Sequence, residues 1–259
     1  MFSYPGLNRG EKILNECRNL YFTGTGNSLH VAREVKRRLE GSKLVPIVKL
    51  LNNDRIMTDA EKVGFVFPNF CLSIPIAVDE FLKEVDLSSS RYIFAVCTRG
   101  GTTSKAFDRI DKILGRQDEQ LDAYINVNMP WNTLLGEENL PGEATEDNMD
   151  RLEENMRKKL DRFCRSVRKG ERYRKADTDV TLELPRYAKV LDFLIPESLD
   201  YWLHKYMYQR KIVFYCDPGC DSCGICEKVC PMENISMTKE NPIWGDNCIS
   251  CFACFHWCP

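Results

Sequence analysis

The sequence predicts an α/β protein, in which an open, doubly wound parallel sheet of five strands is followed by a small cysteine-rich α+β domain. Two observations carry this prediction. Over the first two thirds of the 259-residue chain, short apolar segments alternate with amphipathic helical segments, as in a parallel sheet covered by helices on both faces. Nine of the 13 cysteines then lie between residues 216 and 259, which places a domain boundary near Lys211.

Five apolar segments are expected to form the strands. They are residues 20–22, 44–48, 63–67, 92–97 and 124–127. The fourth segment is almost continuously apolar, as is typical of a buried parallel strand, whereas the fifth is shorter and more polar and is expected at an edge. Five strands suit the order 2-1-3-4-5, with the ligand at their carboxyl ends beside the switch point.

Helices are expected between the strands, where apolar residues recur every three or four positions. Val31, Val35 and Leu39 define the first helix, and residues 76–85, 104–114 and 152–167 the others. Residues 151–175 carry 11 basic and four acidic side chains. This charge fits a solvated helix face or, alternatively, a docking surface for the acidic C-terminal domain.

The chain is divided into three parts. Residues 1–175 are expected to form the α/β domain, with a loose extension over the first nine residues. Residues 176–210 are an aromatic-rich helical connector, and residues 211–259 are the cysteine-rich domain.

The cysteine-rich domain contains two copies of the spacing C-x-x-C-x-x-C-x-x-x-C-P. Thiolate sulfur is a soft ligand that suits iron–sulfur clusters, and in paired motifs of this kind the fourth cysteine binds the other cluster. The spacing therefore predicts two 4Fe–4S clusters. One is expected to bind Cys220, Cys223, Cys226 and Cys258, and the other Cys248, Cys251, Cys254 and Cys230.

Structural zinc and disulfides are the alternatives for these cysteines. Zinc sites group four ligands as two pairs rather than as triplets with a distant fourth ligand, which favours clusters. The remaining five cysteines share no spacing and are interpreted as ordinary thiols: Cys17, Cys71, Cys97, Cys164 and Cys216.

The turn between the first strand and the first helix predicts a phosphate site. It consists of Thr23, Gly24, Thr25, Gly26, Asn27 and Ser28. Backbone N–H groups of such a turn, with the helix N-terminus, can hold a phosphate dianion without a lysine. A dinucleotide fingerprint needs a third glycine, where this chain has Leu29, and a P-loop needs a lysine, so neither pattern fits.

This turn resembles the FMN-phosphate loop of flavodoxins, and the cysteine repeat resembles that of bacterial two-cluster ferredoxins. Residues 129–132 (MPWN), 214–215 (FY) and 241–244 (NPIW) extend the likeness. The chain is similar to flavodoxin–ferredoxin fusion proteins ("ferrodoxins") over roughly residues 20–259. The resemblance implies a flavodoxin-like fold, bound FMN and two 4Fe–4S clusters.

The resemblance also implies that two loops enclose the isoalloxazine ring. The residues concerned are Pro68, Asn69, Phe70, Thr98, Arg99, Gly100 and Gly101. Phe70 is expected to stack on the ring, and Arg99 and the glycine amides to face its polar edge. The alternative is a pair of connecting loops around one buried phenylalanine.

Two departures from the family pattern are noted. Residues 17–19 are polar where flavodoxins have an apolar run, so a weak first strand is expected. The chain stops at Pro259, where ferredoxins continue into a strand that pairs with residues 211–215. We therefore expect a truncated C-terminus, with Cys258 on a frayed end and its cluster the more labile one.

Together these features predict an electron-transfer protein that passes electrons between two clusters and FMN in one chain, with redox proteins as partners. One alternative is an FMN-dependent oxidoreductase that reduces an organic acceptor, with the clusters as electron inlet. Another is a cluster-based redox sensor without flavin. An electron carrier is preferred over a dedicated enzyme because the scheme needs no catalytic residue, and His30, His204 and His256 are scattered.

Composition excludes other classes. A formal net charge of −2 argues against a nucleic-acid binder, and no apolar run has the length of a transmembrane segment. The high cysteine content, without a signal peptide, fits a reducing cytoplasm, where thiolates stay available for metal.

Overall fold

The structure is a computed structural model. It describes residues 17–51, 56–70, 73–101, 104–130, 132, 146–175, 179–180, 199, 202 and 212–259. The expected N-terminal extension, Cys71 and most of the expected connector lie outside these residues.

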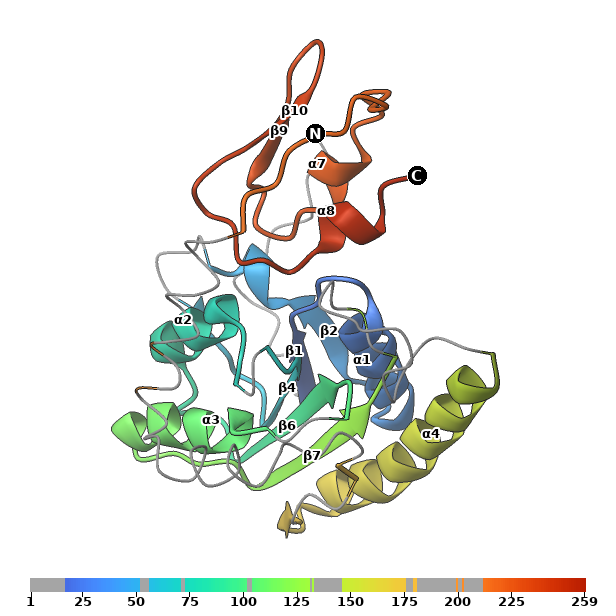
Figure 1. Cartoon of the computed structure of the whole chain (residues 1–259). Coiled ribbons are helices and arrows are strands. Elements are labelled where there is room, and N and C mark those ends of the chain that lie inside the picture. The colour runs from blue at the N-terminus through green and yellow to red at the C-terminus, as the bar shows by residue number, and fades with distance from the viewer. Residues whose placement is uncertain are drawn as a thin grey trace.

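Six parallel strands form one sheet in the order β2-β1-β4-β6-β7-β8 (Figure 1). They are β1 (Cys17–Tyr21), β2 (Lys43–Pro46), β4 (Lys62–Pro68), β6 (Tyr92–Arg99), β7 (Ala123–Asn128) and β8 (Tyr173–Arg174). The first five strands have the predicted order 2-1-3-4-5, so the prediction of a flavodoxin-like α/β fold is confirmed. A short parallel pair, β3 (Ile56–Met57) and β5 (Val85–Asp86), lies outside this sheet.

Three expectations about the strands were wrong. The strand β7 is not at the edge, because Tyr173 and Arg174 of β8 pair with it. The strand β1 is not weak either, because it begins at Cys17 and pairs with β2 on one side and β4 on the other. Its polar residues have partners: Asn19 is fully buried and donates to Ser42 Oγ over 2.9 Å. Residues 47–49, expected in or beside the second strand, form the 3-10 helix η1 (Ile47–Lys49).

Among the described residues, four helices cover the sheet. The helices α1 (Asn27–Arg38) and α4 (Glu146–Lys169) pack on one face, and α2 (Ile76–Glu84) and α3 (Ala106–Leu114) on the other (Figure 1). Successive strand residues point to opposite faces, so Phe65 joins the core under α2 and α3 while Val66 joins the core under α1 and α4. This explains why the central strands are continuously apolar.

A buried ion pair joins the two helices α2 and α3. Asp79 has no exposed surface, and Nε and Nη2 of Arg109 each lie 2.6 Å from its Oδ1 atom. Lys83, one turn along α2, pairs with Asp79 Oδ2. A carboxylate at this depth needs such partners, because an unpaired buried charge is strongly destabilising.

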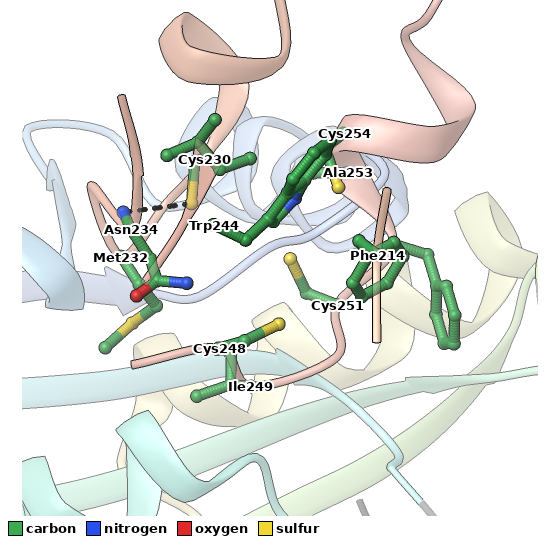
Figure 2. A pocket seen from close by; sticks show the side chains of 12 residues that line it. Phe214, Cys230, Met232, Asn234, Trp244, Cys248, Ile249, Cys251, Ala253 and Cys254 are labelled. Atoms are coloured by element: carbon green, nitrogen blue, oxygen red, sulfur yellow. Dashed lines mark hydrogen bonds between the residues drawn. The ribbon is translucent and has the colours of Figure 1, made fainter. Parts of the chain in front are cut away.

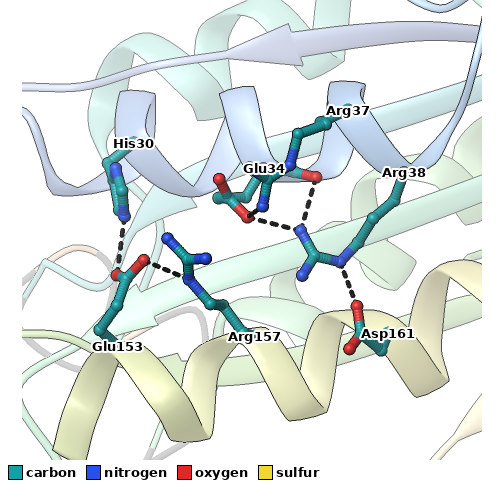
Figure 3. A network of polar contacts seen from close by, with 7 residues as sticks. All are labelled: His30, Glu34, Arg37, Arg38, Glu153, Arg157 and Asp161. Carbon is teal, nitrogen blue, oxygen red and sulfur yellow. Dashed lines mark hydrogen bonds and ion pairs between the residues drawn. The ribbon is translucent and has the colours of Figure 1, made fainter. Parts of the chain in front are cut away.

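A second network joins α1 to α4 (Figure 3). His30 Nε2 and Arg157 Nε lie 2.8 Å and 2.7 Å from the Glu153 carboxylate. One turn further on, Arg38 bridges Glu34 and Asp161, with 2.6 Å to each carboxylate. These pairs fix how the two helices pack together on their face of the sheet.

The Glu153 contacts predict an effect of pH. Partial burial raises the pKa of the Glu153 carboxyl, but the hydrogen bonds from Arg157 and His30 and their charges lower it to below 4.5 overall. A lowered pKa in the folded state stabilises the protein above the unfolded value, and this stabilisation is lost as pH falls below 4.5. Glu153→Gln should therefore lose stability at pH 7 but approach the parent chain in acid, as measured by urea unfolding at both pH values. An equal difference at both pH values would contradict this assignment.

Residues 212–259 follow the sheet, and we call them the C-terminal domain. It contains α7 (Ile225–Val229), the antiparallel strands β9 (Ile235–Met237) and β10 (Pro242–Trp244), and α8 (Ala253–His256). Figure 1 shows this domain above the ends of the strands, on the side of the turn that precedes α1. Ile249 is buried in the core under α2 and α3.

The alternative that the C-terminal domain docks on the basic helix was wrong. The helix α4 runs along one face of the sheet beside α1, whereas the C-terminal domain lies over the ends of the strands (Figure 1). Its cations pair within or near the helix instead, as in Lys158 with Glu154 and Lys159 with Asp179. The basic segment is thus a solvated helix face.

Candidate functional site at the junction of the two domains

The glycine-rich turn lies at the carboxyl end of β1 and leads into α1. Gly26 adopts a φ of 114°, a conformation that glycine reaches without steric cost, and its N–H donates to Thr23 Oγ1 over 3.2 Å. Ser28 is buried, and its hydroxyl lies 2.7 Å from Thr98 Oγ1. The turn is therefore tied to the end of β6 as well as to its own helix.

The N-terminus of α1 suits an anion. No described side chain caps it, and its first turn contains no acidic residue. Its first backbone N–H groups thus have no intrahelical partner, and the helix dipole favours negative charge at this end. The hydroxyl of Thr25 accepts a hydrogen bond from Asn132 Nδ2, which leaves the Thr25 hydroxyl hydrogen for a further acceptor.

The two loops expected at the flavin ring lie side by side at the ends of β4 and β6. The N–H of Asn69 donates to Thr98 O over 2.7 Å, and Ser104 Oγ donates to Asn69 Oδ1 over 2.9 Å. The Arg99 side chain is buried, with Nε 2.8 Å from Asn128 Oδ1.

The ring of Phe70 packs edge-to-face on Phe22, with 6.2 Å between the centroids. Gly101 is buried with a φ of 103°. Pro68 closes β4 and pairs with Thr98 in β6, and Gly100 follows β6 directly. The structure thus brings the two loops together, and it places Phe70 against the core.

A second pocket lies in the C-terminal domain, and we call it the four-cysteine pocket (Figure 2). Its cysteines are Cys230, Cys248, Cys251 and Cys254. They are the four cysteines that the spacing assigns to one cluster: three from the second copy and the fourth from the first. Apolar side chains complete the lining, among them Phe214, Met232 and Ile249.

Backbone N–H groups point at the thiols of this pocket. The N–H of Asn234 lies 3.4 Å from Cys230 Sγ, and that of Ser250 lies 3.4 Å from Cys248 Sγ. Burial raises the pKa of the Cys251 thiol to about 12, although the Ala253 N–H acts to lower it. A soft metal would have to displace this proton on binding.

The indole of Trp244 also faces this pocket. Its Nε1 atom is buried and has no partner with full hydrogen-bond geometry among the described residues. It nevertheless lies close enough to Cys254 to lower the pKa of that thiol, against the larger opposite effect of burial. A buried N–H without a partner is costly, so the sulfur side of the pocket, at Cys254, is where this donor finds its acceptor.

The two cysteine copies share an unusual backbone. Ser222 and Ser250, each just before the second cysteine of its copy, have φ values of 57° and 52°. Gly224 and Phe252, each just after that cysteine, have φ values of 72° and 58°. A bulky residue such as Phe252 seldom adopts this conformation, and such strain gathers at ligand sites.

The cysteines Cys220, Cys223, Cys226 and Cys258 form what we call the first cysteine set. Cys220, Cys223 and Cys258 are exposed. Cys226 is the most enclosed, and its pKa is raised by burial first and then by the neighbouring Cys223 and Cys220. Cys223 and Cys220 thus act electrostatically on Cys226, whereas no described contact joins Cys258 to them. Within the described part of the chain, no set of three or more His, Cys, Asp or Glu side chains is placed to hold a single metal ion.

The two candidate sites touch. An ideal Cβ built on Gly24 would lie 2.6 Å from Cys251 O and 3.0 Å from Cys251 Cβ. Nearby, His256 Nε2 lies 2.7 Å from the backbone oxygen of Asn132. The side-chain amide of Asn132 in turn donates to the Thr25 hydroxyl. Sequence reasoning missed this junction. In the sequence, Gly24 stood out only as part of the phosphate turn, and Asn132 only as part of the MPWN stretch of the family resemblance.

Comparisons with known proteins gave matches among solved structures only. No family model and no curated protein matches the chain. Among solved structures, rubredoxin oxygen:oxidoreductase from Desulfovibrio gigas has a TM-score of 0.36 and 11% identity to this chain. The match covers 60% of this chain but only 36% of that protein. A Megasphaera elsdenii flavodoxin has a TM-score of 0.33 and 11% identity, covering 56% of this chain and 98% of that one. A flavone reductase has a TM-score of 0.39 and 8% identity, covering 79% of this chain and 100% of that one.

In the part of the chain that the structure describes, every helix is too short or too polar to cross a membrane.

Proposed function

We propose that this protein transfers electrons between an FMN in the α/β domain and two 4Fe–4S clusters in the C-terminal domain. The single observation that carries the proposal is the four-cysteine pocket. Four cysteines from two separate copies of the motif line one space, in the combination that a two-cluster repeat requires. Three ligands from one copy and one from the other differ from the two pairs of ligands that zinc sites use.

The residues of the pocket fit a cluster. Cysteine thiolates would hold the iron, and the N–H groups of Asn234, Ser250 and Trp244 would donate to sulfur. Hydrogen bonds to sulfur are one of the means by which a protein sets a cluster's potential.

The residues of the turn fit the phosphate of FMN. The uncapped N-terminus of α1, the amides of the turn and the Thr25 hydroxyl would bind the dianion. The loops at residues 68–70 and 98–101 would position the ring, with Asn69 held by Thr98 and Ser104. The bound flavin would supply two-electron chemistry and each cluster one-electron chemistry. The chain's own part is to bind, orient and shield these groups.

Redox partner proteins and a reducing cytoplasm belong to the same proposal, because exposed thiols such as Cys220 and Cys223 stay available for iron only where they remain reduced.

Coupled reduction tests the proposed function. Protein purified without oxygen and reduced by a limiting amount of dithionite should share electrons between the flavin absorbance and the broad cluster band. If iron and sulfide are present but acid releases no flavin, the protein is a cluster-based sensor and the proposal fails. If reduced protein transfers electrons to quinones or azo dyes but to no protein carrier, the function is instead that of a reductase.

Replacing Trp244 with phenylalanine should lower the reduction potential of one cluster. The phenyl ring keeps most of the packing against Phe214, whose ring is stacked on Trp244 with 6.2 Å between centroids. It removes the buried N–H that faces Cys254, and with it a donor that stabilises the more negative, reduced cluster. Titration of the electron-spin signals should show one cluster shifted and the other unchanged. An unchanged pair of potentials would show that the indole N–H does not reach sulfur.

A further inference from the structure

We propose that the two clusters have a fixed order, in which the cluster of the four-cysteine pocket is the inner one, beside the flavin, and the cluster of the first cysteine set is the outer one. External redox proteins would then exchange electrons only with the outer cluster. This inference rests on the proposed function, and it assigns the two cluster sites different roles.

The first argument is the contact at Gly24. This residue belongs to the phosphate turn, and its backbone meets the backbone of Cys251 so closely that a Cβ would lie 2.6 Å from Cys251 O. Cys251 is a ligand of the four-cysteine pocket. The two cofactor sites are therefore separated by one turn of backbone on each side, with no side chain between them at this point.

The second argument is that this contact is anchored. Ile249, two residues before Cys251, is 7% exposed and belongs to the core of the α/β domain, against which Met232 and Cys251 also pack. The hydrogen bond from His256 to Asn132 O joins α8, which also contributes Cys254 to the pocket, to the residue that orients Thr25. Apolar and polar contacts thus hold the pocket on the turn.

The third argument is the position of the first cysteine set. Three of its four cysteines are exposed, whereas every cysteine of the pocket is at least partly enclosed. The outer site thus opens to solvent, where a partner can approach, while the inner site faces the turn.

The order defines the class of partner. Two molecules of a one-electron carrier, such as another iron–sulfur protein, would each give one electron to the outer cluster. Each electron would pass to the inner cluster and then to FMN. Two such transfers, with protons from water, would reduce the flavin by two electrons and would oxidise the two carriers by one electron each. The reverse flow obeys the same balance.

Gly24→Ala tests the junction. The φ of Gly24 is not in the left-handed region, so its backbone conformation is open to alanine. The added Cβ would, however, clash with the backbone of Cys251. A matched control is Gly115→Ala, where no atom lies within 4 Å of the added Cβ and the φ is −60°. In full-length protein, Gly24→Ala should increase hydrogen exchange of amides 248–252 and slow flavin–cluster electron exchange several-fold, while Gly115→Ala changes neither. Parent-like exchange of these amides in Gly24→Ala would overturn the inference.

Two ligand variants test the order itself. The variant Cys223→Ser should lack the outer cluster. After photoreduction of its flavin and rapid freezing, the electron-spin signal of the remaining inner cluster should appear at the parent rate. Cys254→Ser should lose the inner cluster, and the remaining signal should appear much more slowly. The opposite ranking would overturn the order. Flavin, iron and sulfide are quantified in the same samples. If the parent chain holds all its cofactors but the rates of the two variants are ranked the other way, only this inference is contradicted. If the parent chain lacks FMN or iron, the proposed function is contradicted and this inference with it.

Discussion

Replacing Asp79 with alanine is expected to destabilise the protein by about 3–5 kcal/mol. Asp79 is completely buried, and the Arg109 side chain that it pairs with is only 8% exposed. Removal of the carboxylate leaves the guanidinium buried without this counter-ion. Lys83 is 35% exposed and can turn towards water, so most of the loss comes from Arg109. Urea unfolding, followed by far-ultraviolet circular dichroism, measures the change in the free energy of unfolding.

An exposed ion pair supplies the control for Asp79. Arg91 and Glu61 lie 4.0 Å apart, with side chains that are 84% and 57% exposed. Arg91→Ala should change the free energy of unfolding by less than about 1 kcal/mol, because water screens such a pair. A similar loss in the two variants would mean that Asp79 is not the buried ion-pair partner described above.

Replacing Cys254 with serine should remove one complete cluster, about half of the iron bound by the parent chain. The Cys254 thiol belongs to the four-cysteine pocket and faces the indole of Trp244. Serine is nearly isosteric, but its hydroxyl is a hard ligand that binds iron–sulfur clusters poorly. Iron analysis and electron-spin spectra of anaerobic protein should show one signal lost, with the flavin retained.

Cys216→Ser is the matched control for Cys254→Ser. Cys216 is partly buried like the pocket cysteines but lies outside both copies of the spacing and outside the lining of the pocket. It should keep both clusters and the flavin. Loss of iron from Cys216→Ser, or full iron in Cys254→Ser, would contradict the ligand assignment.

Most of the fold could be predicted from the sequence because it depends on local patterns. A strand buried on both faces, such as residues 92–97, must be apolar throughout, and helices between such strands impose the parallel order. The strand β8 was not predicted because it consists of only two residues, Tyr173 and Arg174, which are too few to show a periodic pattern. The strand β1 was underrated because Asn19 reads as polar, although Ser42 satisfies its amide in the core.

Some features of the candidate sites could likewise be predicted from the sequence, and others could not. The cysteine spacing and the turn at residues 23–28 are local features, and both could be found without coordinates. The contact of Gly24 with Cys251 and the hydrogen bond of His256 to Asn132 could not. They depend on how two domains dock, and the residues concerned are more than a hundred positions apart. The buried indole N–H of Trp244 beside Cys254 likewise becomes visible only when its surroundings are known.

Quantitation of cofactors on one anaerobic sample tests the central claim most directly. Iron, acid-labile sulfide and acid-extractable flavin should be measured against protein by amino-acid analysis. Two 4Fe–4S clusters and one FMN predict about eight iron ions, about eight sulfide ions and about one flavin for each chain. Zinc without sulfide, or a protein with neither iron nor flavin after anaerobic reconstitution, would contradict the account.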